Sequence, residues 1–243
     1  MNQFQMQWFS PALQQEMPIA VYGHYGQAIL LIPTAAADLL EYERFHLIEA
    51  IAPLINAGKF KVFSVNSINN QSWLNQSMLP EHKAIKHNQF NEYIYNEVIP
   101  FIKMQTSSET PIYTCGASFG ALHAMNLFLK NPHNIQGTIS MSGVYNLQDY
   151  TKGYFDEQVY FNSPYHYIPN LHDSWFLDPI KYSNHIHIYT GSGNYEDPHS
   201  NWLFSQVLQN KNIPHELSIW GNDVHHDWVT WRKMLPFILE SRF

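Results

Sequence analysis

Short apolar runs alternate along the chain with longer segments in which apolar residues recur every three or four positions. The short runs predict buried strands at residues 28–33, 61–65, 111–115, 137–141, 186–190 and 216–220. The segments between them predict helices at residues 45–55, 81–103, 120–130 and 202–208, with a last helix through Trp231, Leu235 and Ile238. Such alternation predicts an α/β fold with a mostly parallel central sheet and helices on both faces.

Two segments depart from this regular pattern. Pro100 lacks a backbone N–H, so we expect it to kink or shorten the helix at residues 81–103. Residues 150–182 are rich in Tyr, Asn, Pro and His, have no periodicity and are too long for an ordinary connection. We interpret them as an insertion over the sheet edge, or a lid, within a single domain spanning residues 1–243.

Composition narrows the choice of partners. The chain has 243 residues, is 45% hydrophobic and carries a formal net charge of −7 without a Lys/Arg cluster, which argues against nucleic acid or a membrane as its partner.

Cys115 is the only cysteine, so no internal disulfide can form. The polar residues 1–15 lack the pattern of a signal peptide, and no apolar stretch approaches a membrane span. We therefore expect a cytoplasmic protein.

The most informative motif is Gly116-Ala117-Ser118-Phe119-Gly120, a G-x-S-x-G element between a predicted strand and a predicted helix. A serine on such a sharp turn projects above the sheet, and the neighbouring chain passes so close that the flanking positions favour glycine. The helix N-terminus beside it favours developing negative charge. Ser118 is therefore the predicted nucleophile, whereas the Ser/Gly clusters at residues 140–143 and 191–193 are interpreted as strand-end turns.

A nucleophilic serine needs a histidine as its base and a carboxylate that orients the histidine. His226 follows the last predicted strand, and we prefer it to His225 because His-Asp-Trp leads directly into the final helix. The loop after residues 186–190 offers Glu196 and Asp197 as the acid. Glu196 is preferred, with Asp197 as the alternative, since Asp197 precedes a proline and could instead begin the next helix.

Metal-ligand spacings are absent from the sequence. His185 and His187 alternate along one strand, but no H-E-x-x-H or paired-cysteine motif occurs. We therefore expect no metal site.

Together these features resemble the putative-esterase branch of the α/β-hydrolase superfamily, which includes esterase D-like, tributyrin-type and feruloyl esterases and the mycolyltransferases. The landmarks of the resemblance are residues 10–13 before a strand ending at residues 21–23, and residues 32–37, 65–67, 72–73, 116–120, 160–164 and 221–228. The resemblance implies an α/β-hydrolase fold, a Ser-acid-His triad, an acyl-enzyme intermediate and no cofactor. It also implies an oxyanion hole formed by the backbone N–H groups of Phe119 and Ala35.

One departure from the family bears on the substrate. Many relatives carry glycines in the first loop, where this chain has Thr34 and three alanines. The added bulk, together with the insertion at residues 150–182, predicts a confined site for short acyl chains. The leading hypothesis is thus hydrolysis of a small-molecule carboxylic ester. The alternatives are acyl transfer by the same triad, and a non-catalytic binding protein, which is disfavoured because every triad member occurs in the expected chain order.

Overall fold

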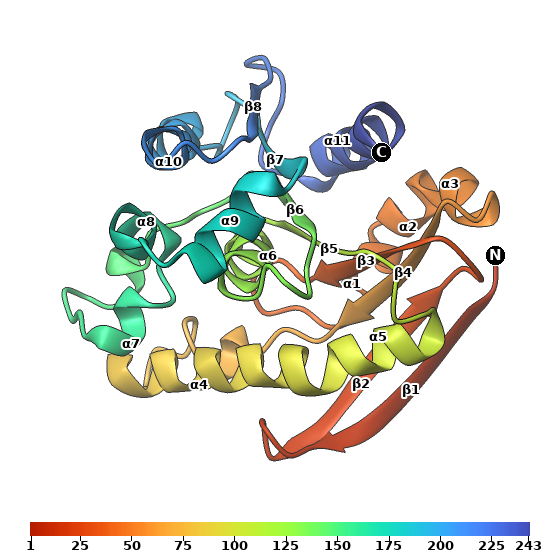
Figure 1. Cartoon of the computed structure of the whole chain (residues 1–243), viewed down its shortest axis with the longest axis horizontal. Coiled ribbons are helices and arrows are strands. Elements are labelled where there is room, and N and C mark those ends of the chain that lie inside the picture. The colour runs from red at the N-terminus through yellow and green to blue at the C-terminus, as the bar shows by residue number, and fades with distance from the viewer.

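Eight strands form one sheet in the computed structural model, which describes residues 1–243 (Figure 1). Their order across the sheet is β1-β2-β4-β3-β5-β6-β7-β8. The strands are β1 (Gln3–Ser10), β2 (Gln15–Tyr22), β3 (Gln27–Ile32), β4 (Phe60–Val65), β5 (Ile112–Ala117), β6 (Gly137–Met141), β7 (His185–Thr190) and β8 (Glu216–Ile219). The block from β4 to β8 is parallel throughout, whereas β2 lies antiparallel to both β1 and β4.

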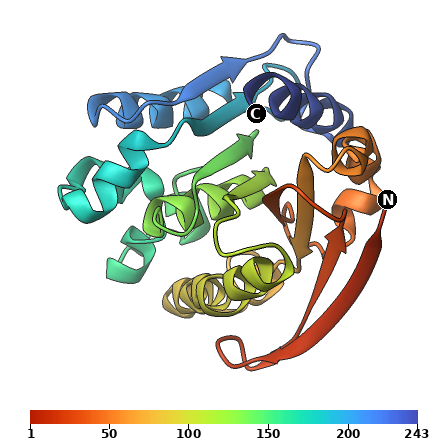
Figure 2. The same ribbon diagram turned by 45° about the vertical axis from the view of Figure 1, so that its right-hand side comes forward.

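Helices cover both faces of this sheet (Figures 1 and 2). One face carries α4 (Pro80–Tyr93), η2 (Ile94–Val98), α5 (Ile99–Gln105), α6 (Phe119–Lys130), α8 (Pro164–Tyr167), η4 (Ile168–Asn170), α9 (Ser174–Tyr182) and α10 (Pro198–Asn210). The other face carries α1 (Glu41–Arg44), α2 (Leu47–Ala50), α3 (Ala52–Asn56) and α11 (Trp228–Arg242). Three more short helices are η1 (Asn69–Gln71), η3 (Gln148–Tyr150) and α7 (Glu157–Tyr160). The predicted arrangement of helices on both faces is confirmed.

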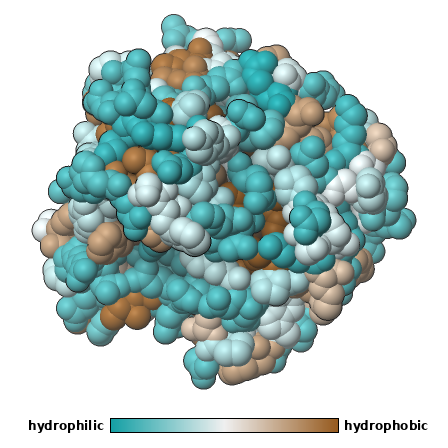
Figure 3. All heavy atoms as spheres, viewed as in Figure 1, coloured by the Kyte–Doolittle hydropathy of each residue, from teal (hydrophilic) through white to brown (hydrophobic).

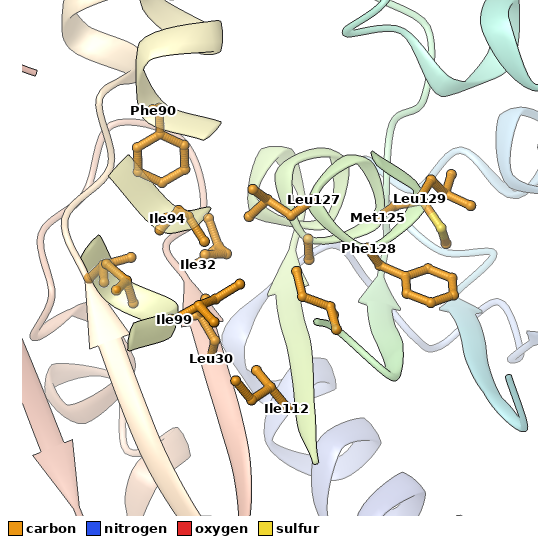
Figure 4. Packing of buried hydrophobic residues seen from close by; sticks show 14 of the residues in the cluster. Leu30, Ile32, Phe90, Ile94, Ile99, Ile112, Met125, Leu127, Phe128 and Leu129 are labelled. Atoms are coloured by element: carbon orange, nitrogen blue, oxygen red, sulfur yellow. The ribbon is translucent and has the colours of Figure 1, made fainter. Parts of the chain in front are cut away.

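The central strands are apolar on both sides because each side faces a layer of helices. Successive residues of β3 therefore point into different cores. Leu30 belongs to a cluster of 34 buried residues and Leu31 to a cluster of 24. Figure 4 shows Phe90, Ile94 and Ile99 of the α4-η2-α5 run gathered over the Leu30 side of the sheet. This packing holds the carboxyl ends of the parallel strands in fixed relative positions.

One helical prediction was wrong and another was wrong in part. Residues 45–55 hold two short helices, α2 and α3, in place of the single helix expected. Ile51, with φ −100° and ψ 3°, separates them, and His46, with φ 62°, separates α2 from α1. Pro100 was expected to kink or shorten its helix, and the shortening was wrong, because the helical run continues to Gln105. Instead the run contains a π-helical turn, η2, directly before α5. A wider turn before a proline is one way in which a helix adjusts to the missing N–H donor.

The segment at residues 150–182 packs against helices on one face of the molecule. Its helix α7 contacts α4, while α8 and α9 contact α6. Among its aromatic residues Tyr167 is buried and Tyr154 packs against a small core cluster, whereas Trp175 is exposed. The segment is therefore largely anchored by its own side chains.

Hydrophobic residues on the face seen in Figure 3 lie in separate patches among hydrophilic ones. None of the helices combines the length and the apolar character needed to cross a bilayer.

Candidate active site

Ser118 occupies the single residue between the end of β5 and the start of α6. Its φ of 56° and ψ of −124° lie in a region that residues other than glycine rarely adopt. Holding the backbone there costs about 1–3 kcal/mol. Its backbone N–H donates to the carbonyl of Met141 on the neighbouring strand at 2.9 Å. This strained turn directs the serine toward the carboxyl end of the sheet, beside the N-terminus of α6.

The two glycines of the motif are required by close backbone contacts. A Cβ at Gly116 would overlap the backbone of Gly120, and a Cβ at Gly120 would overlap the carbonyls of Ile32 and Pro33. The loop after β3 therefore passes directly beside the turn that carries Ser118. Both glycine positions of the predicted motif have a steric explanation.

His226 lies in the loop between β8 and α11. Its Nε2 is 2.9 Å from Ser118 Oγ, although the two residues are 108 positions apart. Its backbone N–H donates to the Asn194 carbonyl at 3.0 Å, and its ring packs edge-on against Trp231. The backbone and one face of the ring are thus both held in place.

Glu196 lies on the far side of the His226 ring. Its Oε2 is 3.6 Å from His226 Nδ1, and its side chain is fully buried. Burial alone would raise the pKa of Glu196, but contacts with His226 and hydrogen bonds from Ser142 and Thr190 lower it, and the net shift is downward. Glu196 is therefore an ionised carboxylate adjoining the imidazole at neutral pH.

The other two candidates from the sequence have different contacts. Asp197 caps α10, where its side chain accepts the Ser200 N–H at 2.9 Å. His225 Nδ1 accepts the Asn194 N–H at 2.8 Å, which ties the loop after β8 to the loop after β7. The structure thus brings Ser118, His226 and Glu196 together, and gives Asp197 and His225 contacts within the supporting loops.

Three residues at the site were not anticipated from the sequence. Ser142 donates to Glu196 Oε1 at 2.7 Å and accepts the Trp231 Nε1–H at 3.0 Å, while Thr190 donates to Glu196 Oε2 at 3.0 Å. The sequence interpretation assigned Ser142 only to a strand-end turn. The usable signal was its place directly after β6, since β6 lies between the strands that precede Ser118 and Glu196.

The loop after β3 presents the second predicted oxyanion donor, Ala35. Thr34 donates through both its backbone N–H and its hydroxyl to the buried Glu41, at 2.8 and 2.7 Å. The Ala35 carbonyl accepts from Ser67 Oγ at 2.8 Å and from Asn69 Nδ2 at 2.7 Å. These bonds fix the groups on both sides of the Ala35 N–H. As the first residue of α6, Phe119 has a backbone N–H without an intrahelical acceptor.

Other titratable groups and a cavity lie away from Ser118. No set of three or more His, Cys, Asp or Glu side chains is arranged to hold a metal ion. His187 pairs with Glu216 at 3.0 Å, and burial raises the pKa of the Cys115 thiol. A cavity of about 470 Å³ lined by Tyr25, Gly58 and Lys59 lies at the amino ends of the strands, opposite Ser118.

The model of a protein family described as putative esterase matches residues 14–241 of the chain. No curated protein matches the chain.

Solved structures of several hydrolases resemble this one. A ferulic acid esterase is 16% identical, with 98% of this chain and 96% of that chain covered and a TM-score of 0.74. An S-formylglutathione hydrolase from Agrobacterium tumefaciens is 14% identical over 99% and 95% of the two chains, with a TM-score of 0.73. The fluorophosphonate-binding serine hydrolase F of Staphylococcus aureus is 16% identical over 98% and 97%, with a TM-score of 0.69. The predicted α/β-hydrolase fold is confirmed.

Proposed function

Because the chain belongs to the putative esterase family, and is a carboxylic ester hydrolase, we propose that Ser118 is its nucleophile, His226 its general base and Glu196 its orienting acid. The observation that carries this proposal is the 2.9 Å contact between His226 Nε2 and Ser118 Oγ. A serine hydroxyl is almost unreactive at its ordinary pKa, so a base within hydrogen-bond reach is its first requirement.

The proposed reaction has two halves. In the first, His226 takes the Ser118 proton while Oγ attacks the ester carbonyl, and the resulting imidazolium then protonates the departing alcohol. In the second, His226 deprotonates a water molecule that attacks the acyl-enzyme carbonyl. The imidazolium then returns this proton to Ser118 Oγ as the bond from Oγ to the acyl carbon breaks and the carboxylic acid leaves. Glu196 keeps the proton on His226 Nδ1 and stabilises the imidazolium that forms in each half.

The negative charge on the former carbonyl oxygen needs fixed donors. We assign these to the backbone N–H groups of Phe119 and Ala35, assisted by the N-terminal dipole of α6. The fixed neighbours of Ala35 support this assignment, since Thr34 is held by Glu41 and the Ala35 carbonyl by Asn69. Donors that are already in place need no reorganisation during the reaction.

Alanine variants test the triad. Ser118→Ala and His226→Ala should each lower kcat for a p-nitrophenyl ester by about 10⁶-fold, as loss of either member does in comparable triads. His225→Ala is the matched control, because its ring contacts the Asn194 N–H and not Ser118. Near-normal turnover by Ser118→Ala, or a greater loss from His225→Ala than from His226→Ala, would refute the assignment.

We further propose that the substrate is an ester of a short acyl chain. Tyr150 packs edge-on against Phe119 with ring centroids 4.8 Å apart, and Phe119 adjoins Ser118. In this proposal Tyr150 forms a wall of the acyl site, and Ala35 and its neighbours add side-chain bulk near the turn. Both features support a confined acyl site.

A series of p-nitrophenyl esters of increasing acyl length tests this second proposal. For the wild type kcat/KM should fall steeply with length, and Tyr150→Ala should reduce that fall by opening the wall. A rise in kcat/KM with acyl length in the wild type would contradict the proposal.

A further inference from the structure

Two buried histidines lie between α4 and α6, outside the proposed triad. His87 is 0% exposed and His123 is 2% exposed, and their ring centroids are 4.4 Å apart. Burial lowers the pKa of His123 to about 3 and places the pKa of His87 well below its ordinary value, so both rings are neutral at neutral pH. A neutral imidazole carries one donor and one acceptor, and its neighbours decide which nitrogen is which.

Each histidine is hydrogen-bonded on the side that faces away from the other histidine. The groups on those two sides determine which nitrogen of each ring carries the proton. Trp73 Nε1–H can only donate, so His87 Nδ1 is its acceptor at 3.1 Å and the His87 proton is on Nε2. At the other end the Ala35 carbonyl can only accept, so Asn69 turns its Nδ2 toward Ala35 and its Oδ1 toward His123. His123 Nε2 therefore donates to Asn69 Oδ1 at 2.9 Å, and His123 Nδ1 is left as an acceptor.

The two remaining nitrogens are complementary. His87 Nε2–H and His123 Nδ1 are both buried without a partner, one being a donor and the other an acceptor. A single water molecule that accepts from His87 Nε2 and donates to His123 Nδ1 would join the two rings into one directed sequence of hydrogen bonds. It runs from Trp73 through His87, His123 and Asn69 to the Ala35 carbonyl.

We propose that His123 and Asn69 are positioning residues for ester hydrolysis, holding the loop after β3 so that the Ala35 N–H faces the oxyanion, with His87 and Trp73 supporting them from behind. This inference rests on the proposed function, because it presumes that Ala35 is an oxyanion donor. Asn69 is 0% exposed and joins η1 to this loop, so its two bonds transmit the position of α6 to Ala35. The Ser67 hydroxyl supplies a second, exposed donor to the same carbonyl.

The test compares substitutions that keep or remove the donors. His123→Leu removes the Nε2–H, whereas His123→Gln can place an amide N–H at the same point; Asn69→Asp keeps the acceptor but loses the donor to Ala35. Complete loss of an oxyanion donor costs 10²–10³-fold in kcat, so a displaced one should cost about 10- to 100-fold in kcat with little change in KM. His123→Gln should restore most of kcat.

Asn91→Leu is the control for loss of a buried polar group between the same helices. Asn91 is 2% exposed and donates to Asn162, with no link to Ala35, so this variant should lower the melting temperature without lowering kcat. If His123→Leu does not fold, Ser67→Ala removes the other donor to the Ala35 carbonyl at the surface and should lower kcat with KM unchanged.

Wild-type kcat in folded His123→Leu and Asn69→Asp would overturn the inference, as would equal losses in His123→Gln and His123→Leu. Ser118→Ala separates a failure of the proposed function from a failure of the positioning role. If Ser118→Ala abolishes turnover while Asn69→Asp keeps the wild-type kcat, only the positioning role fails. If Ser118→Ala retains turnover, the proposed function fails first.

Discussion

Adjacent residues of the same charge have different contacts in this protein. Glu196 is buried against His226, while Asp197 caps α10. Tyr195, which directly precedes Glu196, has a φ of 62° and turns the backbone there. The side on which a carboxylate lies is thus set by backbone geometry that composition does not reveal.

Glu196→Gln and Asp197→Ala should therefore have separate effects. Loss of the carboxylate next to the histidine should lower kcat on the order of 10⁴-fold, as replacement of a triad acid by its amide does elsewhere. Loss of the helix cap should cost about 0.5–2 kcal/mol of stability and leave kcat close to that of the wild type. Steady-state kinetics and thermal unfolding measure the two effects. The opposite order of kcat losses would move the acid to Asp197.

Sequence reasoning could identify candidate residues but not the contacts that support them. Ser118 and His226 follow from motif and chain order, because the turn requires glycines and the loop after the last strand offers few bases. Ser142 and Trp231 have no such pattern, since the bond from Ser142 to Glu196 spans 54 residues and the bond from Trp231 to Ser142 spans 89. Only the assembled sheet brings these segments together.

The π-helical turn η2 is hydrogen-bonded to the hairpin of β1 and β2. Glu97, within η2, accepts from Trp8 Nε1 at 2.7 Å, from Ser10 Oγ at 2.8 Å and from the Ala12 N–H at 3.3 Å. All three donors belong to the hairpin formed by β1 and β2 or to its turn. One carboxylate thus fastens the edge of the sheet to the helix layer.

Glu97→Ala should destabilise the protein by about 1–3 kcal/mol, because it leaves the buried Ser10 hydroxyl and two other donors without their acceptor. The values of kcat and KM should stay unchanged, since the hairpin lies at the sheet edge, three strands from β5. Urea unfolding beside ester kinetics checks both halves. Glu92→Ala, at an exposed position of α4, is the control, and equal stability losses in the two variants would refute the role of Glu97.

Elements with strong periodicity were predictable, and those shaped by tertiary contacts were not. The strand β6 and the helix α6 match their predicted positions because each has an apolar pattern bounded by clear turn signals. The edge strand β1 was overlooked, although Gln3, Gln5 and Gln7 alternate there with apolar residues. The short helices at residues 150–182 depend on packing against α4 and α6, which no local pattern encodes.

At the scale of the whole molecule, the strand order explains why residues so distant in sequence meet. The strands β5, β6, β7 and β8 are parallel neighbours, so the residues after their carboxyl ends lie side by side. Ser118, Ser142, Glu196 and His226 follow these four strands in that order. The predicted order of serine, acid and histidine is therefore also a spatial order across one edge of the sheet. A single domain over residues 1–243 remains a prediction.

The most direct test of the account is to identify the residue that a fluorophosphonate probe modifies. Intact-mass measurement and peptide mapping should find one adduct per chain, on Ser118, because its hydroxyl contacts a histidine that also faces the buried Glu196 carboxylate, and it lies at the N-terminus of α6. Ser163 and Ser205 also contact histidines, but we do not propose either as a nucleophile. The adduct should disappear in Ser118→Ala and persist in His225→Ala. Modification of another residue, or no modification of a folded and active enzyme, would contradict the claim that Ser118 is the nucleophile.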